Sequence, residues 1–308
     1  MRYAISRLVI FGVGLIGGSL ALSLKQAGAV GTVVGVDRCS GNLQQAQALG
    51  IVDVIADNIE EALAAAEIAV LAVPVGQMAA VMQEIAPWLE PRTIVTDAGS
   101  TKQDVVALMQ RHLAGHLSRC VPAHPIAGAE LSGAAAARAD LYLNKKIVIT
   151  PLPEIHARNE NNEYTSLPAT DSAAVDRIAA MWQYCGAQTS IMSADVHDAI
   201  FAAVSHLPHL LAYSLVNMIA QRDNADQLFG FAAGGFRDFT RIAGSSPEMW
   251  RDIAIANRPS ILAELAAFQK ELGQLQAALR DGNAGALMQL FSRAQQSRLE
   301  WLLQNPPD

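Results

Sequence analysis

The sequence predicts an α/β domain with a mostly parallel sheet, followed by an all-α domain. Short apolar runs alternate with helical segments over the first 192 residues, and the strand pattern stops after Ser193. Long apolar helical segments follow from there onwards. A chain of 308 residues is also longer than one ordinary hydrophobic core requires. We therefore expect two domains, at residues 1–192 and 193–308.

The first domain is predicted from its apolar runs, which give strands at 8–13, 32–37, 68–73, 93–97, 120–123, 147–150 and 188–192. A run such as IAVLAV (68–73) is apolar at every position, which indicates a strand buried on both faces and hence a parallel sheet covered by helices. Helical segments at 19–26, 77–88 and 176–185 supply that cover. The polar, turn-rich stretch 154–172 interrupts the pattern and is predicted to be a surface loop.

The second domain is predicted to be helical from its first residues. Ser193 is a good N-cap, and Asp195 lies in the first turn, where the helix dipole favours a carboxylate. The predicted helices are 194–221, 247–256, 259–280 and 284–303. These helices are long and apolar with little polar cover, so we expect this half to pair with a second copy and give a homodimer.

The composition argues against several classes of protein. The net charge is -7 and no basic stripe is present, so we expect no nucleic-acid partner. The three cysteines have no paired spacing, which is typical of a reducing cytoplasm and argues against a disulfide scaffold or a zinc site. Glycines interrupt the apolar stretch 8–24, and no other stretch approaches 18 apolar residues without Gly or Pro. We therefore expect a cytoplasmic protein without a membrane span.

A glycine motif follows the first predicted strand. The sequence FGVGLIGGSL places Gly12, Gly14 and Gly17 between a strand and a helix. Such glycines permit a tight turn, let the backbone approach a pyrophosphate and let the helix pack on the strand, while the helix N-terminus favours phosphate. Asp37 ends the second predicted strand 20 residues after Gly17, where an acidic side chain accepts hydrogen bonds from ribose hydroxyls. The motif predicts a Rossmann-like domain that binds NAD.

The choice between NAD and NADP depends on two neighbouring residues. Asp37 repels a 2′-phosphate and so favours NAD, whereas Arg38 directly after it weakens that preference and leaves NADP as the alternative. The other predicted cofactor contacts are Leu15 and Ile16, within the glycine motif, and Val73 and Pro74, at the end of the third predicted strand.

Two polar residues after later strands are candidates for the chemistry. His124 ends a strand in VPAHPIAGAE, and Ser100 follows another in VTDAGSTK. Because ligands bind at the carboxyl ends of parallel strands, His124 is placed to face a nicotinamide, where a neutral imidazole can accept an alcohol proton. On position alone, a structural histidine is the alternative for His124, and Ser100 by itself is better explained as a cap of the helix that starts at Thr101.

The second half contains a cluster of histidines in HDAIFAAVSHLPHLLAY. His206 and His209 share a helix face, whereas His197 lies opposite His206 on an ideal helix. The three side chains converge only if Pro208 kinks the helix, so we predict no metal site. At least one of the three is expected to line a cleft.

A Gly-rich segment, GGFRDFTRIAGSSPEMW, adds Arg241 and Trp250 as expected parts of the substrate site. A buried arginine needs an anionic partner, and a substrate carboxylate would serve for Arg241. A salt bridge from Arg241 to Asp238 or Glu248 is the alternative.

These motifs together resemble the prephenate/arogenate dehydrogenase family (cyclohexadienyl dehydrogenases) of tyrosine biosynthesis. The matching stretches keep the family's order over residues 8 to 260, and they are FGVGLIGGSLA, VTDAGSTK, HPIAGAE, DVHDAIFAAVSHLPHLLA and FRDFTRIAGSSPEMWRDI. The resemblance implies a Rossmann-like domain followed by a helical dimerisation domain.

The resemblance also implies roles for individual residues. His124 looks like the catalytic histidine that accepts a hydrogen bond from the ring C4 hydroxyl, and Ser100 resembles the serine that orients this hydroxyl and the nicotinamide. Arg241 looks like the arginine that binds a substrate carboxylate. His197 and His209 resemble residues that line the pocket.

The implied reaction is NAD-dependent oxidative decarboxylation of prephenate to 4-hydroxyphenylpyruvate, or of arogenate to tyrosine, with no metal. Both substrates stay open, and we favour prephenate. Another Rossmann-type dehydrogenase, acting on a β-hydroxy acid, is one alternative, but such enzymes commonly use a helical-domain lysine and the second half offers only Lys270. A non-catalytic NAD-binding module is the other.

Overall fold

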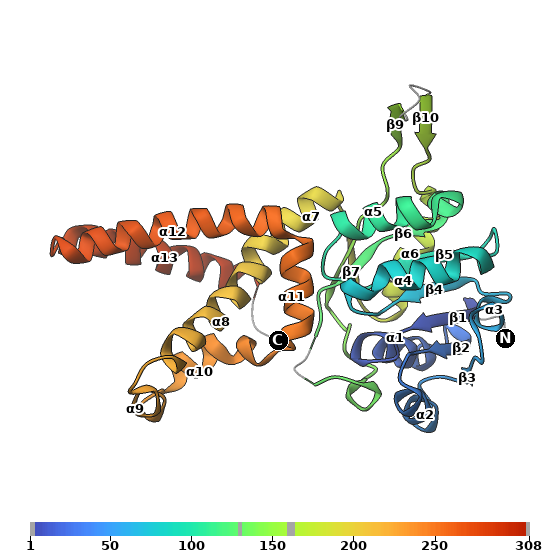
Figure 1. Cartoon of the computed structure of the whole chain (residues 1–308), viewed down its shortest axis with the longest axis horizontal. Helices are drawn as coiled ribbons and strands as arrows, with labels where there is room; N and C mark the ends of the chain where they lie inside the picture. Colours follow the sequence, from blue (N-terminus) through green and yellow to red (C-terminus); the bar gives the residue numbers. More distant parts are fainter. Residues whose placement is uncertain (1–3, 129–130, 159–163, 306–308) are drawn as a thin grey trace. The chain divides into compact units, whose positions relative to one another are not determined.

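The parallel sheet expected for the first half is present in the computed structural model, which describes residues 4–128, 131–158 and 164–305 (Figure 1). Within those residues, six parallel strands lie in the order β3-β2-β1-β4-β5-β6. Their bounds are β1 Ile5–Phe11, β2 Val30–Val36, β3 Val54–Ile55, β4 Ile68–Leu71, β5 Ile94–Asp97 and β6 Cys120–Val121. The strand order reverses between β1 and β4, which is where a sheet of this kind forms a crevice at the carboxyl ends of its strands.

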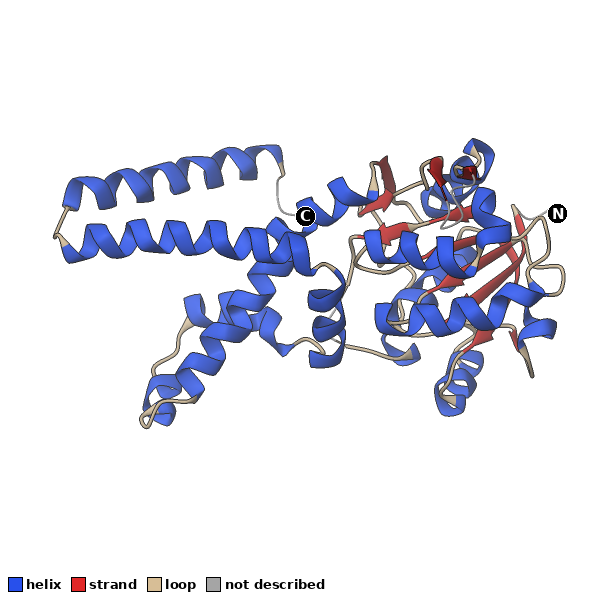
Figure 2. Ribbon diagram, turned by 45° about the horizontal axis from the view of Figure 1, so that its top comes forward, coloured by secondary structure: helices blue, strands red, loops and turns tan. Residues whose placement is uncertain are grey.

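Helices cover both faces of this sheet (Figure 2). Along β1, Leu8 and Ile10 belong to one core cluster while Val9 and Phe11 belong to the other, as the twofold period of a strand requires. The first cluster includes residues of α1 (Leu15–Gln26), α2 (Ser40–Ala48) and α6 (Ser172–Tyr184). The second includes residues of α3 (Ile59–Leu63), α4 (Val75–Ile85) and α5 (Gln103–His112). The all-apolar strands are therefore buried on both sides, as predicted.

The chain leaves the six-stranded sheet at Pro122 and enters a smaller one. In this second sheet β7 (Ala123–Pro125) is antiparallel to β8 (Lys146–Ile149), and β11 (Gln188–Ile191) is parallel to β8. The backbone N–H of Ala123 donates to Oδ1 of Asp97 at 3.0 Å. Since Asp97 ends β5, this bond fixes the start of β7, and with it His124, at the carboxyl edge of the large sheet.

The prediction of a surface loop at 154–172 is wrong in part. The strands β9 (Ile155–Arg158) and β10 (Tyr164–Leu167) pair as an antiparallel hairpin that projects from the sheet domain (Figure 1). The segment is polar and turn-rich in sequence, so its strands were not recognised from the apolar pattern that marks buried strands. Residues 159–163, which belong to the same expected loop, lie outside the described residues.

The helical half begins with α7 (Ala194–Phe201), a π turn (Ala202–His206) and α8 (Leu207–Ala220), which together form one helix. It continues with α9 (Ala225–Gly230), α10 (Gly234–Thr240), a 3-10 turn (Arg241–Gly244) and α11 (Pro247–Ala256). Residues 1–258 form one compact unit, since α7 contacts α5 and α11 contacts α4. The helices α12 (Arg258–Arg280) and α13 (Ala284–Gln304) belong to the second unit. The domain boundary at 192/193 stays a prediction.

The helix Ala194–Ala220 is long and apolar enough to cross a membrane, and it is the one such helix among the described residues. Its composition is not that of a simple apolar span, because it carries His197, Asp198 and His206 in buried positions. These polar side chains are hydrogen-bonded within the first unit.

Candidate active site

The glycine motif forms the turn between β1 and α1. Gly12 has a φ of +91°, and a Cβ there would lie 2.6 Å from the carbonyl oxygen of Ala72. A Cβ on Gly17 would lie 2.7 Å from a methyl carbon of Ile10, whereas a Cβ on Gly14 would meet no atom within 4 Å. The space beside Gly14 is therefore open at the N-terminus of α1. That helix has no side-chain cap and no acidic residue in its first turn, so its positive dipole end suits an anion.

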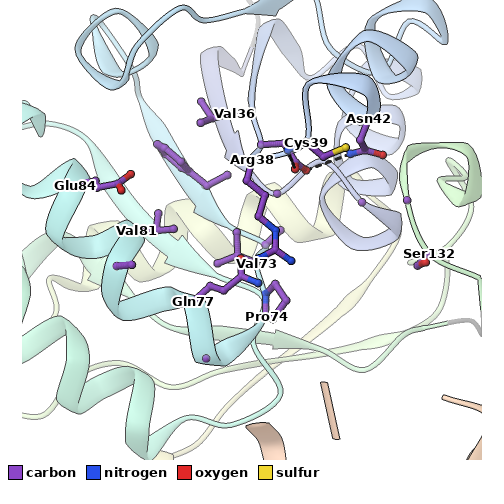
Figure 3. Close-up of a pocket in the computed structure, with 18 of the residues that line it drawn as sticks. Val36, Arg38, Cys39, Asn42, Val73, Pro74, Gln77, Val81, Glu84 and Ser132 are labelled. Atoms are coloured by element: carbon purple, nitrogen blue, oxygen red, sulfur yellow. Dashed lines mark hydrogen bonds between the residues drawn. The ribbon is translucent and has the colours of Figure 1, made fainter. Parts of the chain in front are cut away.

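A cavity of about 830 Å³ lies beside this turn (Figure 3). Its walls include most of the predicted cofactor contacts: Gly12, Gly14, Asp37, Arg38, Val73 and Pro74. The Arg38 side chain extends across it toward Val73, Pro74 and Gln77 (Figure 3). A cavity of this size at the strand-order reversal fits a dinucleotide.

The Asp37 carboxylate is held from several sides. It accepts hydrogen bonds from the backbone N–H groups of Val13 and Cys39, both at 3.0 Å, and from the side-chain amide of Asn42 at 3.2 Å. The Asn42 amide also donates to the Val13 carbonyl oxygen at 2.9 Å. Asn42 thus ties Asp37 to the glycine turn, a role that sequence reasoning missed because nothing in the motif marks that position.

A second cavity of about 350 Å³ adjoins the first and shares Gly14, Val73 and Pro74 with it. Its walls add Leu15, Ile16 and Ser100 from the sheet domain, and Ser245, Ser246, Met249 and Ile253 from the helical half. Ser100 therefore lies where the two halves of the chain meet around the cavity. Gly17, in contrast, is buried beneath the turn.

His124 lies half-buried on β7, with its ring against Phe201 at a centroid distance of 5.0 Å. Its Nδ1 is 2.9 Å from Nε2 of His197. Burial lowers the pKa of His124 well below its ordinary value, and the nearby His197, Lys102 and His206 lower this pKa further. The His124 imidazole is therefore neutral at pH 7, as a proton acceptor must be.

His197 lies behind His124 and is fully buried. Its Nδ1 is 2.8 Å from Oδ1 of Asp198. Burial lowers the pKa of His197, and the bond to Asp198 only partly opposes this, so the contact is a hydrogen bond from a neutral ring rather than an ion pair. A residue with no exposed surface does not line a pocket directly, so His197 lies behind His124, and its assignment to the substrate site stays a prediction.

The carboxylate of Asp198 caps α5 from α7. It accepts hydrogen bonds from the backbone N–H groups of Lys102 at 2.8 Å and Gln103 at 2.9 Å, at the start of a helix with no side-chain cap of its own. Burial by itself would raise the pKa of Asp198, but the hydrogen bonds from His197, Gln103 and Lys102 hold this pKa below its ordinary value. Asp198 is thus a buried carboxylate that stays charged.

A buried ion pair supports the same region. The ammonium of Lys102 contacts Oδ2 of Asp97, and neither side chain is exposed. Asp97 also accepts from the backbone N–H of Gly99 at 2.7 Å, in addition to that of Ala123. Because every charge is paired and hydrogen-bonded, this pair fixes the loop that carries Ser100 relative to β7.

The π turn decides which way the histidines face. Pro208 cannot donate the usual helical hydrogen bond, and the winding changes immediately before it, at Ala202–His206. As a result His197 and His206 are both buried, although nine residues separate them. The Asn257 side-chain amide lies 2.7 Å from the Asp198 carbonyl oxygen and 3.1 Å from Nδ1 of His206. His206 also bonds to the backbone of Ser100, and burial lowers its pKa to about 4.

His209, Trp250 and Arg241 gather on the neighbouring part of the helical half. The His209 ring stacks on Trp250 with centroids 3.8 Å apart and planes 20° apart. Burial lowers the pKa of His209, and the charge of the Arg241 guanidinium lowers it further. The segment between Arg241 and Trp250 supplies Ser245, Ser246 and Met249 to the second cavity, whereas His209, Arg241 and Trp250 do not line it.

The predicted site residues come from two parts of the chain. His124, Ser100 and the glycine turn come from the sheet domain, and His197, His209, Arg241 and Trp250 come from α7, α8, the 3-10 turn and α11. The sequence missed Asp198, Asn257 and the Asp97–Lys102 pair. The only signal for Asp198 was a carboxylate directly after a histidine in an apolar helix, where a charge requires partners. Among the described residues, no group of three or more His, Cys, Asp or Glu side chains is arranged to hold a metal ion.

A parallel sheet of this strand order, a glycine turn beside a large cavity and a neutral histidine at the carboxyl edge define a nucleotide-binding oxidoreductase. The family description "Prephenate dehydrogenase, nucleotide-binding domain" matches residues 20–191, and "Prephenate dehydrogenase, dimerization domain" matches residues 193–293. The chain belongs to the prephenate dehydrogenase family.

Similar proteins agree with this membership over nearly the whole chain. The cyclohexadienyl dehydrogenase of Zymomonas mobilis is 34% identical, over 95% of this chain and 94% of its own. The prephenate dehydrogenase of Bacillus subtilis is 33% identical, over 94% of this chain and 75% of its own.

Two solved structures have the same fold over matching lengths. The prephenate dehydrogenase of A. aeolicus, in complex with hydroxyphenyl propionate and NAD+, superposes with a TM-score of 0.85 and 31% identity, covering 97% of this chain and 99% of the other. The arogenate dehydrogenase of Synechocystis superposes with a TM-score of 0.76 and 25% identity, covering 96% and 99%.

Proposed function

We propose that this protein catalyses the NAD-dependent oxidative decarboxylation of prephenate to 4-hydroxyphenylpyruvate, with arogenate as the competing substrate. The observation that carries the proposal is the neutral His124 at the carboxyl edge of the sheet, backed by buried partners and beside the Ser100 loop. This reaction needs an acceptor for a hydroxyl proton, and a neutral imidazole with a lowered pKa supplies one.

The proposed cofactor is NAD, held by the glycine turn and the larger cavity. The open space at Gly14 leaves room for a pyrophosphate at the N-terminus of α1, and Asp37 stands at the end of β2 where ribose hydroxyls bind. When bound, NAD accepts the hydride from the substrate. Arg38 in the cavity wall is the residue that would accommodate NADP, which is the alternative cofactor.

The proposed roles of the side chains follow from where they lie. His124 accepts the proton of the C4 hydroxyl, and Ser100, in the cavity wall, hydrogen-bonds the same hydroxyl and orients it. Arg241, with His209 and Trp250 beside it, binds a substrate carboxylate.

The bonds and protons balance around His124. As the C4–H electron pair leaves with its hydrogen, the hydroxyl proton passes to His124 and C4 becomes a carbonyl carbon. The bond to the ring carboxylate then breaks, carbon dioxide leaves, and the electron pair makes the ring aromatic. His124 returns its proton to the resulting phenolate oxygen. Formation of the aromatic ring drives these reaction steps, so the protein has to orient the substrate and transfer the proton.

We also propose that the protein acts as a homodimer in the cytoplasm. The matched dimerization domain begins at the helix Ala194–Ala220, which is long and apolar enough to cross a membrane. Buried His197, Asp198 and His206 on that helix are bonded to one another and to the start of α5, which favours a helix of a water-soluble enzyme.

The test is NADH formation by the purified protein, followed by absorbance with prephenate or arogenate and with NAD or NADP. We expect turnover with prephenate and NAD, and a loss of roughly 10²–10⁴-fold in kcat for His124→Asn, the range for removal of a general base. A Rossmann-type dehydrogenase that acts on a β-hydroxy acid would oxidise neither prephenate nor arogenate. A non-catalytic module would bind NAD without turnover of any substrate, and either result would refute the proposal.

A further inference from the structure

We propose that His197 and Asp198 are positioning residues that hold His124 as the neutral tautomer protonated on Nδ1, with its Nε2 lone pair directed at the substrate hydroxyl. The proposal rests on the proposed function for the role of His124. It concerns the two residues behind that histidine. Neither His197 nor Asp198 lines either of the two cavities formed by the described residues.

The tautomer of His197 follows from Asp198. The Asp198 carboxylate has only acceptor oxygens, so the 2.8 Å contact requires that Nδ1 of His197 carry the proton. Because the buried His197 ring is neutral, its Nε2 then has a lone pair and no proton.

The tautomer of His124 follows from His197 in the same way. Nε2 of His197 lies 2.9 Å from Nδ1 of His124, and a lone pair on the first atom requires a proton on the second. A neutral His124 then has its lone pair on Nε2, the nitrogen remote from His197. A relay of three side chains therefore places the basic nitrogen of His124 away from the protein interior.

Asp198 is fixed strongly enough to impose this order. Its two carboxylate oxygens accept from the first backbone N–H groups of α5, and its carbonyl oxygen accepts from Asn257 at 2.7 Å. The carboxylate cannot turn away from His197 without leaving the N-terminus of α5 uncapped. Since α5 begins directly after the Ser100 loop, the same carboxylate sets the position of both residues that meet the substrate hydroxyl.

The relay also has a function when His124 is charged. Once His124 accepts the substrate proton on Nε2, its Nδ1–H bond points to His197, whose own Nδ1–H bond points to the negative charge of Asp198. The positive charge is stabilised along this line without any movement of side chains. When the proton returns to the phenolate oxygen, the relay is restored to its starting state.

The first experiment compares Asp198→Asn with the matched control Asp195→Asn, an exposed carboxylate one turn earlier on α7. With its oxygen toward Gln103, asparagine keeps one of the two capping bonds to α5, while its amide nitrogen replaces Oδ1, which accepts from both Lys102 and His197. The amide N–H then donates to Nδ1 of His197 and so reverses both rings. We expect kcat to fall roughly 10²–10⁴-fold while KM stays within about threefold, because the residue does not touch the substrate. The control should keep kcat within about twofold.

The second comparison keeps the proposal testable if Asp198→Asn does not fold. In His197→Gln the side-chain oxygen can accept from Nδ1 of His124, whereas in His197→Leu nothing can. We expect the Gln variant to retain at least about tenfold more kcat than the Leu variant at equal KM. Equal kcat values for the two variants, or an Asp198→Asn variant as active as the control, would overturn the proposal.

The decisive readout needs no substrate. Ring-¹⁵N-labelled histidine in the full chain should give, for His124, a protonated Nδ1 and an unprotonated Nε2, assigned by the signals lost in His124→Asn. The opposite pattern in the unmutated protein would refute the relay. If neither prephenate nor arogenate is oxidised but this pattern is found, the proposed function fails and the positioning of His124 stands.

Discussion

Four histidines in this protein are kept neutral by their surroundings. His124, His197, His206 and His209 all have pKa values below the ordinary one, and burial is the largest cause for each. Among the described residues, the carboxylate hydrogen-bonded to one of these histidines is that of Asp198, and the bond uses a proton that the neutral His197 ring already has. Burial therefore costs some stability at acid pH and gains a set of bases that are unprotonated at neutral pH.

This balance predicts acid-sensitive folding. A histidine whose pKa is lowered in the folded state binds its proton mainly after unfolding, so the free energy of unfolding falls as pH drops below about 6.5. For His206, whose pKa is lowered to about 4, the loss reaches roughly 3 kcal/mol by the time pH has fallen to that value. Asp198 adds to the loss only at still lower pH, because its own pKa is lowered.

Urea unfolding at a series of pH values between about 7 and 4.5 measures this dependence. His206→Asn provides the comparison, because its side-chain oxygen can still accept from Asn257 but does not titrate. We expect a flatter pH dependence of unfolding free energy in the variant than in the unmutated protein. Parallel curves would show that His206 does not contribute to the acid loss.

At the scale of single elements, Gly14 and Gly17 in the turn from β1 to α1 have different surroundings and therefore different predicted roles. Gly14 faces open space, while Gly17 faces Ile10 and the backbone of the turn. Gly14→Ala should therefore leave the unfolding free energy nearly unchanged but weaken NAD binding at least about tenfold, since a methyl group would stand where the pyrophosphate approaches. Gly17→Ala should lower the unfolding free energy by roughly 1–3 kcal/mol through overpacking.

Urea unfolding and NAD titration by calorimetry on both variants separate these effects. A Gly14→Ala protein with full NAD affinity would contradict the assignment of the turn as the pyrophosphate site. A Gly17→Ala protein of unchanged stability would show that α1 can shift away from β1, contrary to the close packing described here.

The elements also show where sequence reasoning succeeds. Buried parallel strands are apolar at every position and helices carry a 3.6-residue period, so the strands and helices near the site were placed to within a few residues. The glycine turn was found because its backbone geometry demands glycine. The π turn at Ala202–His206 could not be found, because a change of winding leaves no composition signal beyond Pro208. Without it, His197 and His206 were predicted to lie on opposite faces of the helix.

At the scale of the whole molecule, the second unit exposes more apolar surface than a free helix pair tolerates. Within the described part of α12 and α13, Ile261 and Ala278 are the buried residues, while Leu272, Leu279, Met288, Phe291 and Trp301 are exposed. Leu272, Leu275 and Leu279 also line a shallow apolar groove with Gly273. Two helices with so few buried side chains need a partner surface.

A second copy of the chain is the partner that the matched dimerization domain indicates. We therefore expect light scattering to give twice the chain mass of 32.7 kDa at micromolar concentration. Leu279→Glu should raise the dimer dissociation constant roughly 10²–10⁴-fold, because a twofold interface loses the burial of two leucines at about 1.5–3 kcal/mol each. Leu49→Glu, at a leucine of similar exposure in the sheet domain, should leave the mass unchanged. A fully active monomer, or dissociation by Leu49→Glu and not by Leu279→Glu, would exclude this face as the dimer contact.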